Sequence, residues 1–147
     1  MLPALAPDEG ETVAQVFYQD EKHPQSPKLA PDTDGFSWMP EEGFSNAFSQ
    51  HATAEQIALS AAVQRPIAVK CIQEPVPKPA WRSKPCWFLI AEEDRMINPN
   101  TQHFMAKRMG AKTRSLPVDH MPLITASQKV VDITMDATME TKQAISA

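Results

Sequence analysis

The clearest hydrophobic pattern in the chain lies in its second half. Residues 86–91 form a continuous apolar run bounded by a proline and by three acidic residues, which is typical of a strand buried on both faces of a parallel sheet. Asn98 and Pro99 then predict the start of a helix and Gly110 its end, because these residue types are favoured at those positions. We expect three apolar residues to form the inward face of this helix: Phe104, Met105 and Met109.

A second strand is predicted over residues 112–118, at an edge of the sheet because its proline cannot donate a hydrogen bond. Asp119 and His120 follow at its carboxyl end, and a final helix is predicted from about residue 126 into the 130s. Strands that alternate with helices predict right-handed crossovers and a parallel sheet. Since a two-stranded sheet is marginal alone, and residues 86–91 favour partners on both edges, this pattern is typical of part of a larger sheet.

The first half of the chain is less regular. A short helix is predicted near residues 13–17, and the capping box of Thr53 and Gln56 begins a helix that ends before Pro66. Between them, residues 20–45 are rich in Pro, Asp, Ser and Gly, which favours a loop. A lid over a pocket and a peripheral packing loop explain equally well why this loop has four large apolar residues: Phe36, Trp38, Met39 and Phe44.

Glycine is scarce, which excludes several kinds of active site. The chain has four glycines among 147 residues, well below the usual share of ~7%. Successive glycines lie 25, 8 and 67 positions apart. These spacings exclude a Walker A loop, a G-x-G-x-x-G dinucleotide loop and a G-x-S-x-G nucleophile elbow.

Charge adds little to this picture. With a net charge of −4, the chain has no basic footprint for phosphates, so we expect no nucleic-acid partner. No stretch approaches the ~18 apolar residues of a membrane span, and the first eleven residues lack the basic region of a signal peptide. The cationic residues that lie closest together are expected to form a solvated helix end and loop: Lys107, Arg108, Lys112 and Arg114.

Cysteines and histidines bear on compartment and metals. Cys71 and Cys86 allow at most one disulfide, and Cys86 lies in an apolar run where a buried thiol is favoured. We therefore expect a reducing compartment or indifference to redox. The lack of a signal peptide favours a cytoplasmic location. The four histidines are scattered, with no H-x-x-x-H pattern and no paired cysteines, so no metal and no cofactor are expected.

Asp94 and His120 are the candidate chemical pair. Functional crevices of open α/β sheets lie beyond the carboxyl ends of the strands. Asp94 follows the first predicted strand, His120 follows the second, and the 26 residues between them match one β-α-β step. Such a carboxylate can hold an imidazole in one tautomer for general-base catalysis. An acid that only begins a solvated turn and caps the next helix, beside a structural histidine, remains the alternative.

The same residues carry a family resemblance. Residues 91–99 and the following helix resemble the strand, acidic turn and helix near the C-terminus of α/β-hydrolase-fold proteins of the esterase and hydroxynitrile-lyase kind. Residues 119–123 resemble the turn that carries the catalytic histidine of that family. The resemblance spans residues 80–135 and implies that Asp94 is the acid of a catalytic triad and His120 its base.

The resemblance implies an α/β fold, namely a partial α/β-hydrolase fold with a helical cap followed by β-α-β-α of a parallel sheet. Residues 1–79 are then a cap-like or lid-like region, and residues 80–147 are the C-terminal part of the core. Trp38 in the cap and Met121 beside the histidine are expected to contact substrate.

The chain lacks two features that the family needs for activity, the nucleophile and the oxyanion loop. The nucleophilic serine and the oxyanion loop of the family lie upstream of the cap, and no serine of this chain lies at a strand-to-helix elbow.

Two hypotheses follow. The chain is the acid and histidine part of a truncated ester hydrolase, inactive alone, which acts on a small apolar ester if another chain carries the serine. Alternatively, it is a non-catalytic remnant that binds a small apolar ligand or a protein through the cap and an exposed sheet edge. Self-association is expected in either case.

Overall fold

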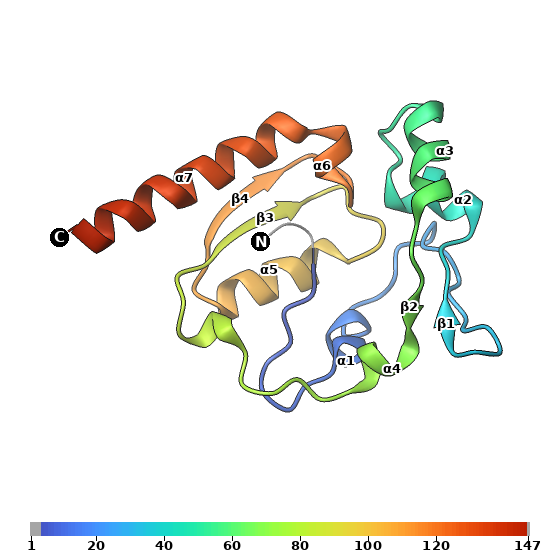
Figure 1. Cartoon of the computed structure of the whole chain (residues 1–147), viewed down its shortest axis with the longest axis horizontal. Helices are drawn as coiled ribbons and strands as arrows, with labels where there is room; N and C mark the ends of the chain where they lie inside the picture. The colour runs from blue at the N-terminus through green and yellow to red at the C-terminus, as the bar shows by residue number, and fades with distance from the viewer. Residues whose placement is uncertain (1–3, 147) are drawn as a thin grey trace.

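Two strands in the second half of the chain pair in parallel, as the hydrophobic pattern predicts. β3 (Trp87–Ala91) lies beside β4 (Lys112–Leu116), with Trp87 opposite Lys112 and Ala91 opposite Leu116. The computed structural model describes residues 4–146, and within this range β3 and β4 form a two-stranded sheet (Figure 1). The prediction that the chain does not begin with a signal peptide concerns its first eleven residues. Residues 1–3 of that segment lie outside the described residues.

Helices cover both faces of this sheet. α5 (Pro99–Arg108) connects the two strands and packs on one face, while α7 (Ser127–Ser146) lies along the other (Figure 1). Phe88 and Ile90 belong to the cluster that includes α5, whereas Leu89 and Ala91 pack with α7. Because these four consecutive residues are all buried, the prediction of a strand buried on both faces is confirmed.

The start of α5 agrees with the sequence, but its inward face does not agree fully. Asn98 is the N-cap and Gly110, with a φ of 58°, follows the helix. Met105 and Met109 are buried as expected, but Phe104 is 45% exposed and lies under the guanidinium of Arg108. The prediction was wrong for Phe104 because the helix turns Gln102, rather than this aromatic ring, toward the strands.

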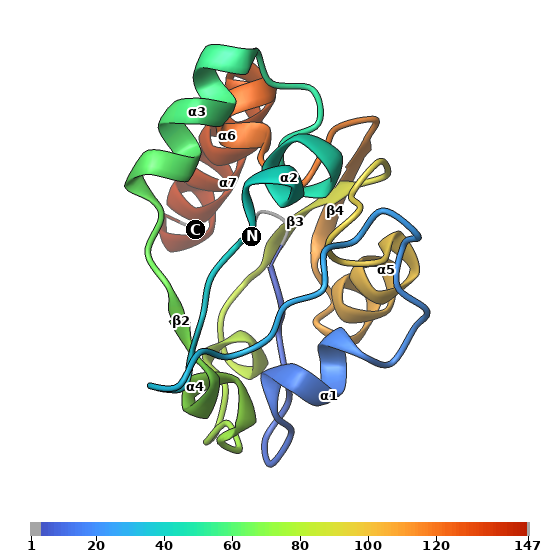
Figure 2. The ribbon, with the colours of Figure 1, turned by 90° about the vertical axis from the view of Figure 1, so that its right-hand side faces the viewer.

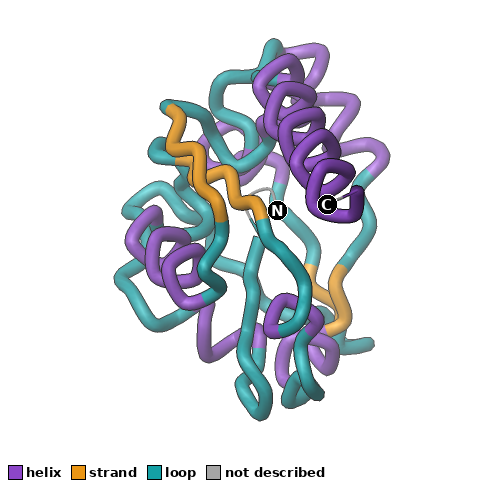
Figure 3. The backbone as a smooth tube through the Cα atoms, turned by 90° about the vertical axis from the view of Figure 1, so that its left-hand side faces the viewer, coloured by secondary structure: helices purple, strands orange, loops and turns teal. Residues whose placement is uncertain are grey.

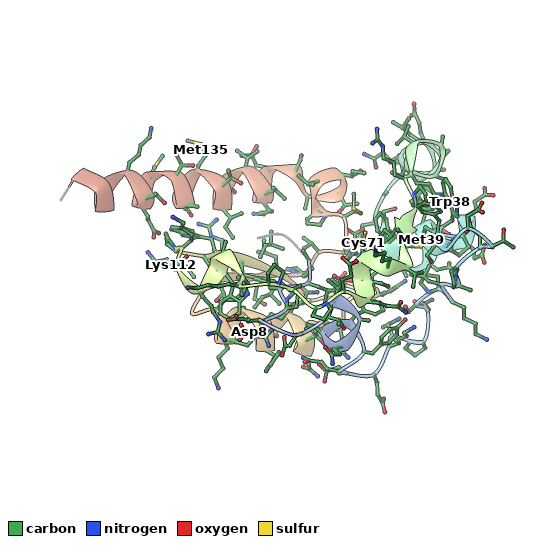
Figure 4. All side chains as sticks on the ribbon, turned by 60° about the horizontal axis from the view of Figure 1, so that its bottom comes forward. Asp8, Trp38, Met39, Cys71, Lys112 and Met135 are labelled. Atoms are coloured by element: carbon green, nitrogen blue, oxygen red, sulfur yellow. The ribbon has the colours of Figure 1, made fainter. Side chains whose placement is uncertain are left out.

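α7 runs further than the sequence pattern indicates and presents an apolar stripe outward. Its buried residues include Val130 and Ile133, which pack under β3. The residues spaced by four along its other side are about half exposed: Val131, Met135 and Met139. Figure 4 shows Met135 on the side of α7 that faces away from the sheet.

β4 is an exposed strand whose charged residues pair with α7. Lys112 forms an ion pair with Glu140, and Arg114 forms one with Asp136. These two cations are solvated as expected, but they lie on the strand that was predicted over residues 112–118 and not in a loop. The expectation of a solvated side chain was wrong for Arg108, whose side chain is 17% exposed and bonds both carboxylate oxygens of Glu11.

The first half of the chain forms short elements. β1 (Phe36–Ser37) and β2 (Ile67–Ala68) pair antiparallel as a second small sheet, which the sequence did not predict and which Figure 3 shows apart from the first. α3 begins at the Thr53 capping box as predicted, and none of its residues is buried. Figure 2 shows α2 and α3 together at one end of the molecule. The elements are α1 (Val13–Phe17), β1 (Phe36–Ser37), α2 (Glu41–Gly43), the π-helix η1 (Phe44–Phe48), α3 (Ala54–Val63), β2 (Ile67–Ala68), α4 (Val69–Gln73) and the 3₁₀ helix η2 (Ala80–Arg82).

The beginning of the chain joins the core beneath β3. Ala6 and Val16 are buried in the same cluster as Phe88 and α5, and the indole of Trp81 donates to the Pro7 carbonyl at 3.1 Å. The boundary near residue 79 stays a prediction. Among the helices of residues 4–146, none combines the length and the apolar character that crossing a membrane requires.

Candidate active site

Asp94 lies in the turn that follows β3, and its carboxylate is surrounded by donors. One oxygen, Oδ1, accepts hydrogen bonds from the backbone nitrogens of Met96 at 2.7 Å and Ile97 at 2.9 Å. The other, Oδ2, accepts from Gln102 Nε2 at 2.8 Å and faces His120 Nδ1 at 2.9 Å. Asp94 is 2% exposed, so its charge is removed from water but satisfied by four partners.

The alternative of a solvated turn that caps the next helix is therefore wrong for Asp94. Its two acidic neighbours, Glu92 and Glu93, are exposed. The N-terminus of α5 is capped instead by Asn98, whose side chain accepts from the Asn100 nitrogen at 2.9 Å. Burial separates Asp94 from the other two acids, although the three are adjacent in the sequence.

His120 follows β4 and meets Asp94 because the two strands are parallel neighbours. The backbone ladder continues past the strands, where the Glu93 nitrogen donates to the Val118 carbonyl at 3.1 Å. The side chain of His120 is 15% exposed. In the neutral imidazole, the contact with Asp94 places the proton on Nδ1, because a carboxylate only accepts hydrogen bonds, and Nε2 is then an acceptor. The structure thus brings together the two residues that the sequence predicted.

Gln102 is a buried residue of the site that sequence reasoning missed. Its Oε1 accepts from the Ala91 nitrogen at 3.0 Å, while its Nε2 donates to Asp94 and, at 3.0 Å, to the Ile97 carbonyl. The side chain is fully buried. It ties the last residue of β3 to the carboxylate. A polar residue one turn into a helix gives no sequence signal for this role, because only packing shows which way it points.

Asp119 was named in the sequence only as the neighbour of His120, yet it is fully buried. Its Oδ2 accepts from the His51 nitrogen at 3.0 Å. Its Oδ1 accepts from the Met121 nitrogen at 3.1 Å and from the Thr125 hydroxyl at 2.6 Å. Asp119 therefore connects the first half of the chain to the turn that carries His120.

The two residues expected at the substrate lie in different places. Met121 follows His120, is half-buried and forms the N-cap of the short helix α6 (Pro122–Thr125). Trp38 is 48% exposed, and its indole donates to Asp32 Oδ2 at 3.3 Å rather than to the Asp94 and His120 pair. Figure 4 shows Trp38 beside Met39 at the cap end of the molecule. Their contact with substrate stays a prediction.

The acidic residues around the pair are engaged by hydroxyl and imidazole groups. Glu92 Oε1 accepts from the Ser115 hydroxyl and lies 2.9 Å from His103 Nε2. The hydrogen bond from Ser115, followed by that from His103, lowers the pKa of Glu92, against the opposing effect of burial. Glu93 pairs with His51 at 2.9 Å. Within residues 4–146, no group of three or more His, Cys, Asp or Glu side chains is arranged to hold a metal ion.

Comparison with known proteins agrees with this geometry. Residues 3–133 match the family described as "Alpha/beta hydrolase family". A solved structure of a histidine-to-alanine mutant of polyneuridine aldehyde esterase is similar, with a TM-score of 0.68 and 13% identity over 92% of this chain and 60% of that chain. A second structure of polyneuridine aldehyde esterase has a TM-score of 0.63 and 13% identity, over 85% of this chain and 51% of that chain. Comparison with curated proteins returns no match.

This chain therefore spans 60% or less of each esterase chain to which it is similar. At 13% identity the likeness shows the fold, including the partial sheet with helices on both faces. The family match is independent of that likeness and covers most of the sequence. On this ground, the chain belongs to the alpha/beta hydrolase family.

Proposed function

We propose that this chain supplies the acid and the base of an ester-hydrolysing site. The observation that supports the proposal is the 2.9 Å contact between Asp94 Oδ2 and His120 Nδ1 beyond the ends of two parallel strands. Asp94 would hold the imidazole with its proton on Nδ1 and stabilise the imidazolium that forms. Nε2 of His120 would then take the proton from a nucleophile and return it to the leaving alcohol.

The nucleophile of this reaction is proposed to come from outside the 147 residues. The sequence contains no G-x-S-x-G elbow, and several serines are engaged elsewhere: Ser49 donates to the Phe44 carbonyl and Ser115 to Glu92. Loss of a triad nucleophile costs roughly a millionfold in rate in a well-studied serine protease. We therefore propose that the chain alone is inactive, and that a second chain or segment carries the serine and the oxyanion loop.

The substrate class we propose is a small apolar ester. The ring of Phe48 lies 5.0 Å from the imidazole of His120, centroid to centroid, and gives the site an apolar wall. Met121 is adjacent to the histidine in the chain. The two cysteines are free thiols, Cys71 exposed and Cys86 half-buried, which fits the reducing cytoplasm as the proposed location.

A fluorophosphonate probe and a p-nitrophenyl ester test the proposed function. We expect neither labelling nor hydrolysis with the chain alone. When it is mixed with a chain that carries the strand, G-x-S-x-G elbow and helix of the family, the serine of that second chain should be labelled and hydrolysis should appear. His120→Ala should abolish that hydrolysis, because no base remains to take the serine proton. His103→Ala, which changes an exposed histidine, is the matched control and should leave it unchanged.

Labelling of the purified chain alone, at the rate of an ordinary serine hydrolase, would contradict the proposed absence of a nucleophile. If no second chain restores hydrolysis, the second candidate function gains support. In that case the chain is a binding remnant, and the exposed stripe of Val131, Met135 and Met139 favours an apolar ligand or a protein partner.

We also propose that the chain self-associates in isolation. In residues 4–146, β3 is paired with β4 in a sheet of two strands, while α7 presents its apolar stripe outward. Such edges and stripes favour association. Sedimentation over a range of protein concentrations should show oligomers whose population falls in Met135→Lys. Gln128→Lys, the same charge change at an exposed polar site of α7, is the control. A monomer at all concentrations would disprove the expectation.

A further inference from the structure

The loops that carry Asp94 and His120 are both held by one short segment of the cap-like region, residues 46–51, which we name the latch. It begins within η1, and Ser49 closes the π-helical turn by donating its nitrogen to the Phe44 carbonyl at 2.8 Å. The latch lies 42 to 72 residues away in sequence from the positions that it contacts, as the pairs His51–Glu93 and Phe48–His120 show. Ala47 and Ser49 are fully buried, so this segment is packed in place rather than laid loosely on the surface.

On one side, the latch binds the acidic turn around Asp94. Gln50 Nε2 donates to the Glu93 carbonyl at 2.6 Å, and the imidazole of His51 pairs with the Glu93 carboxylate at 2.9 Å. From the opposite direction, Arg95 donates to the latch carbonyl of Asn46 at 2.9 Å. The two residues that flank Asp94 in the sequence are thus both fastened to the latch.

On the other side, the latch binds the histidine turn. The His51 nitrogen donates to Asp119 Oδ2 at 3.0 Å. Two residues earlier than Gln50, Phe48 places its ring against the imidazole of His120 with a tilt of 50° and a centroid distance of 5.0 Å. These two contacts are made to Asp119 and His120, which are adjacent in the sequence. A displacement of the latch would therefore move the imidazole both through the backbone and through the Phe48 ring.

Asp119 is the junction of these contacts because each of its oxygens serves a different partner. Oδ1 binds the histidine turn itself, through Met121 and Thr125, while Oδ2 binds the latch, through His51. The carboxylate is fully buried, which makes both groups of hydrogen bonds stronger than exposed ones and costly to leave unmade.

We propose that Asp119 is a positioning residue that holds the latch against the histidine turn and thereby sets the orientation of the His120 imidazole toward Asp94. Asp119 itself does not touch the reacting atoms. The inference rests on the proposed function, in which the orientation of His120 determines catalysis, and it makes the placement of the cap-like region a condition for a competent acid and base pair.

Asp119→Asn affects the hydrogen bonds of the two Asp119 oxygens differently. An asparagine side chain has one acceptor oxygen, and we expect it to occupy the Oδ1 position, where two donors converge. Its amide nitrogen then faces the His51 nitrogen, so two donors oppose each other across the latch contact. The variant therefore loses the hydrogen bond between the Oδ2 position and the latch, and it keeps the hydrogen bonds between Oδ1 and the histidine turn. Thr125→Val instead weakens the contacts of Oδ1, since it removes the Thr125 donor, keeps the Met121 donor and leaves the His51 contact intact.

Two nuclear magnetic resonance readouts on the full chain test the proposal without any activity. In Asp119→Asn, we expect exchange of the His51 amide hydrogen to accelerate at least about tenfold. We also expect the signal of the His120 Nδ1 proton to broaden or disappear as the imidazole leaves its fixed orientation. Thr125→Val should leave the His51 amide protected. Ile133→Val, a core deletion remote from the latch, should lower stability without changing the Nδ1 signal.

An unchanged Nδ1 signal in a folded Asp119→Asn variant would overturn the proposal, and so would equal loss of that signal in Ile133→Val. If Asp119→Asn does not fold, the wild-type chain supplies the test through a urea titration below its unfolding transition. Loss of His51 protection and of the Nδ1 signal at the same urea concentration supports the coupling, and loss of His51 protection alone refutes it. These readouts need no ester hydrolysis, so failure of the proposed function would be seen separately.

Discussion

Asp94→Ala is expected to destabilise the chain by about 3 kcal/mol or more, because a buried donor left without its acceptor costs about 1 to 3 kcal/mol. The substitution leaves four donors without their acceptor, namely two backbone nitrogens, Gln102 Nε2 and His120 Nδ1. Each buried group left unsatisfied carries a penalty of its own. Against a total stability of about 5 to 15 kcal/mol for a typical domain, this loss is large.

Urea unfolding followed by circular dichroism measures this loss of stability, and Glu93→Ala is the matched control. Glu93 is the adjacent exposed acid, and its ion pair with His51 has side-chain exposures of 40% and 48%. An exposed pair contributes about 0 to 1 kcal/mol. Equal destabilisation by the two substitutions would show that Asp94 is not the buried anchor that its hydrogen bonds indicate.

Asp94→Asn extends this first prediction from stability to chemistry. The amide oxygen can keep the two backbone donors at the Oδ1 position, but its nitrogen then faces His120. His120 would accept at Nδ1 and carry its proton on Nε2, which is the wrong tautomer for a base. In the trypsin triad, the corresponding change lowers kcat by about 10⁴. Nitrogen chemical shifts of the His120 ring report the tautomer directly, and a proton retained on Nδ1 would contradict the prediction.

Gln102→Leu is the second change for which we expect a large effect. Leucine fills a similar volume, but it leaves the Ala91 nitrogen without an acceptor, the Ile97 carbonyl without this donor, and Asp94 with one donor fewer. Since an unsatisfied buried group costs about 1 to 3 kcal/mol, we expect a loss on the order of 3 kcal/mol or more. Thermal and urea unfolding should show it as a lower midpoint.

The control for this second prediction is Asn100→Leu, which also replaces an amide by leucine in α5 but at an exposed position. Exposed substitutions of this kind usually change stability by less than about 0.5 kcal/mol. If Gln102→Leu proves as mild as Asn100→Leu, a water molecule or a rearranged side chain satisfies the three groups, and Gln102 is not required to hold the carboxylate.

Much of the candidate site could be predicted because its signals are local. The apolar run of β3, the Asn98 and Pro99 helix start and the Gly110 helix end are short-range features of the chain. They establish a β-α-β unit, and parallel strands bring their carboxyl ends to one edge. Asp94 and His120 follow from that unit, since each lies just past a strand. Burial of Asp94 did not follow, because Glu92 and Glu93 have the same local chemistry and remain exposed.

The sequence by itself therefore determined the β-α-β order of β3, α5 and β4, the caps of α5 and the meeting of Asp94 with His120. Only the tertiary structure decided which polar residues support that pair. Gln102 takes the inward position that Phe104 was expected to share. Asp119 receives the His51 nitrogen from 68 residues away. The physical reason is that a local pattern specifies backbone conformation, whereas the direction and partner of a buried polar side chain depend on which distant segment packs against it.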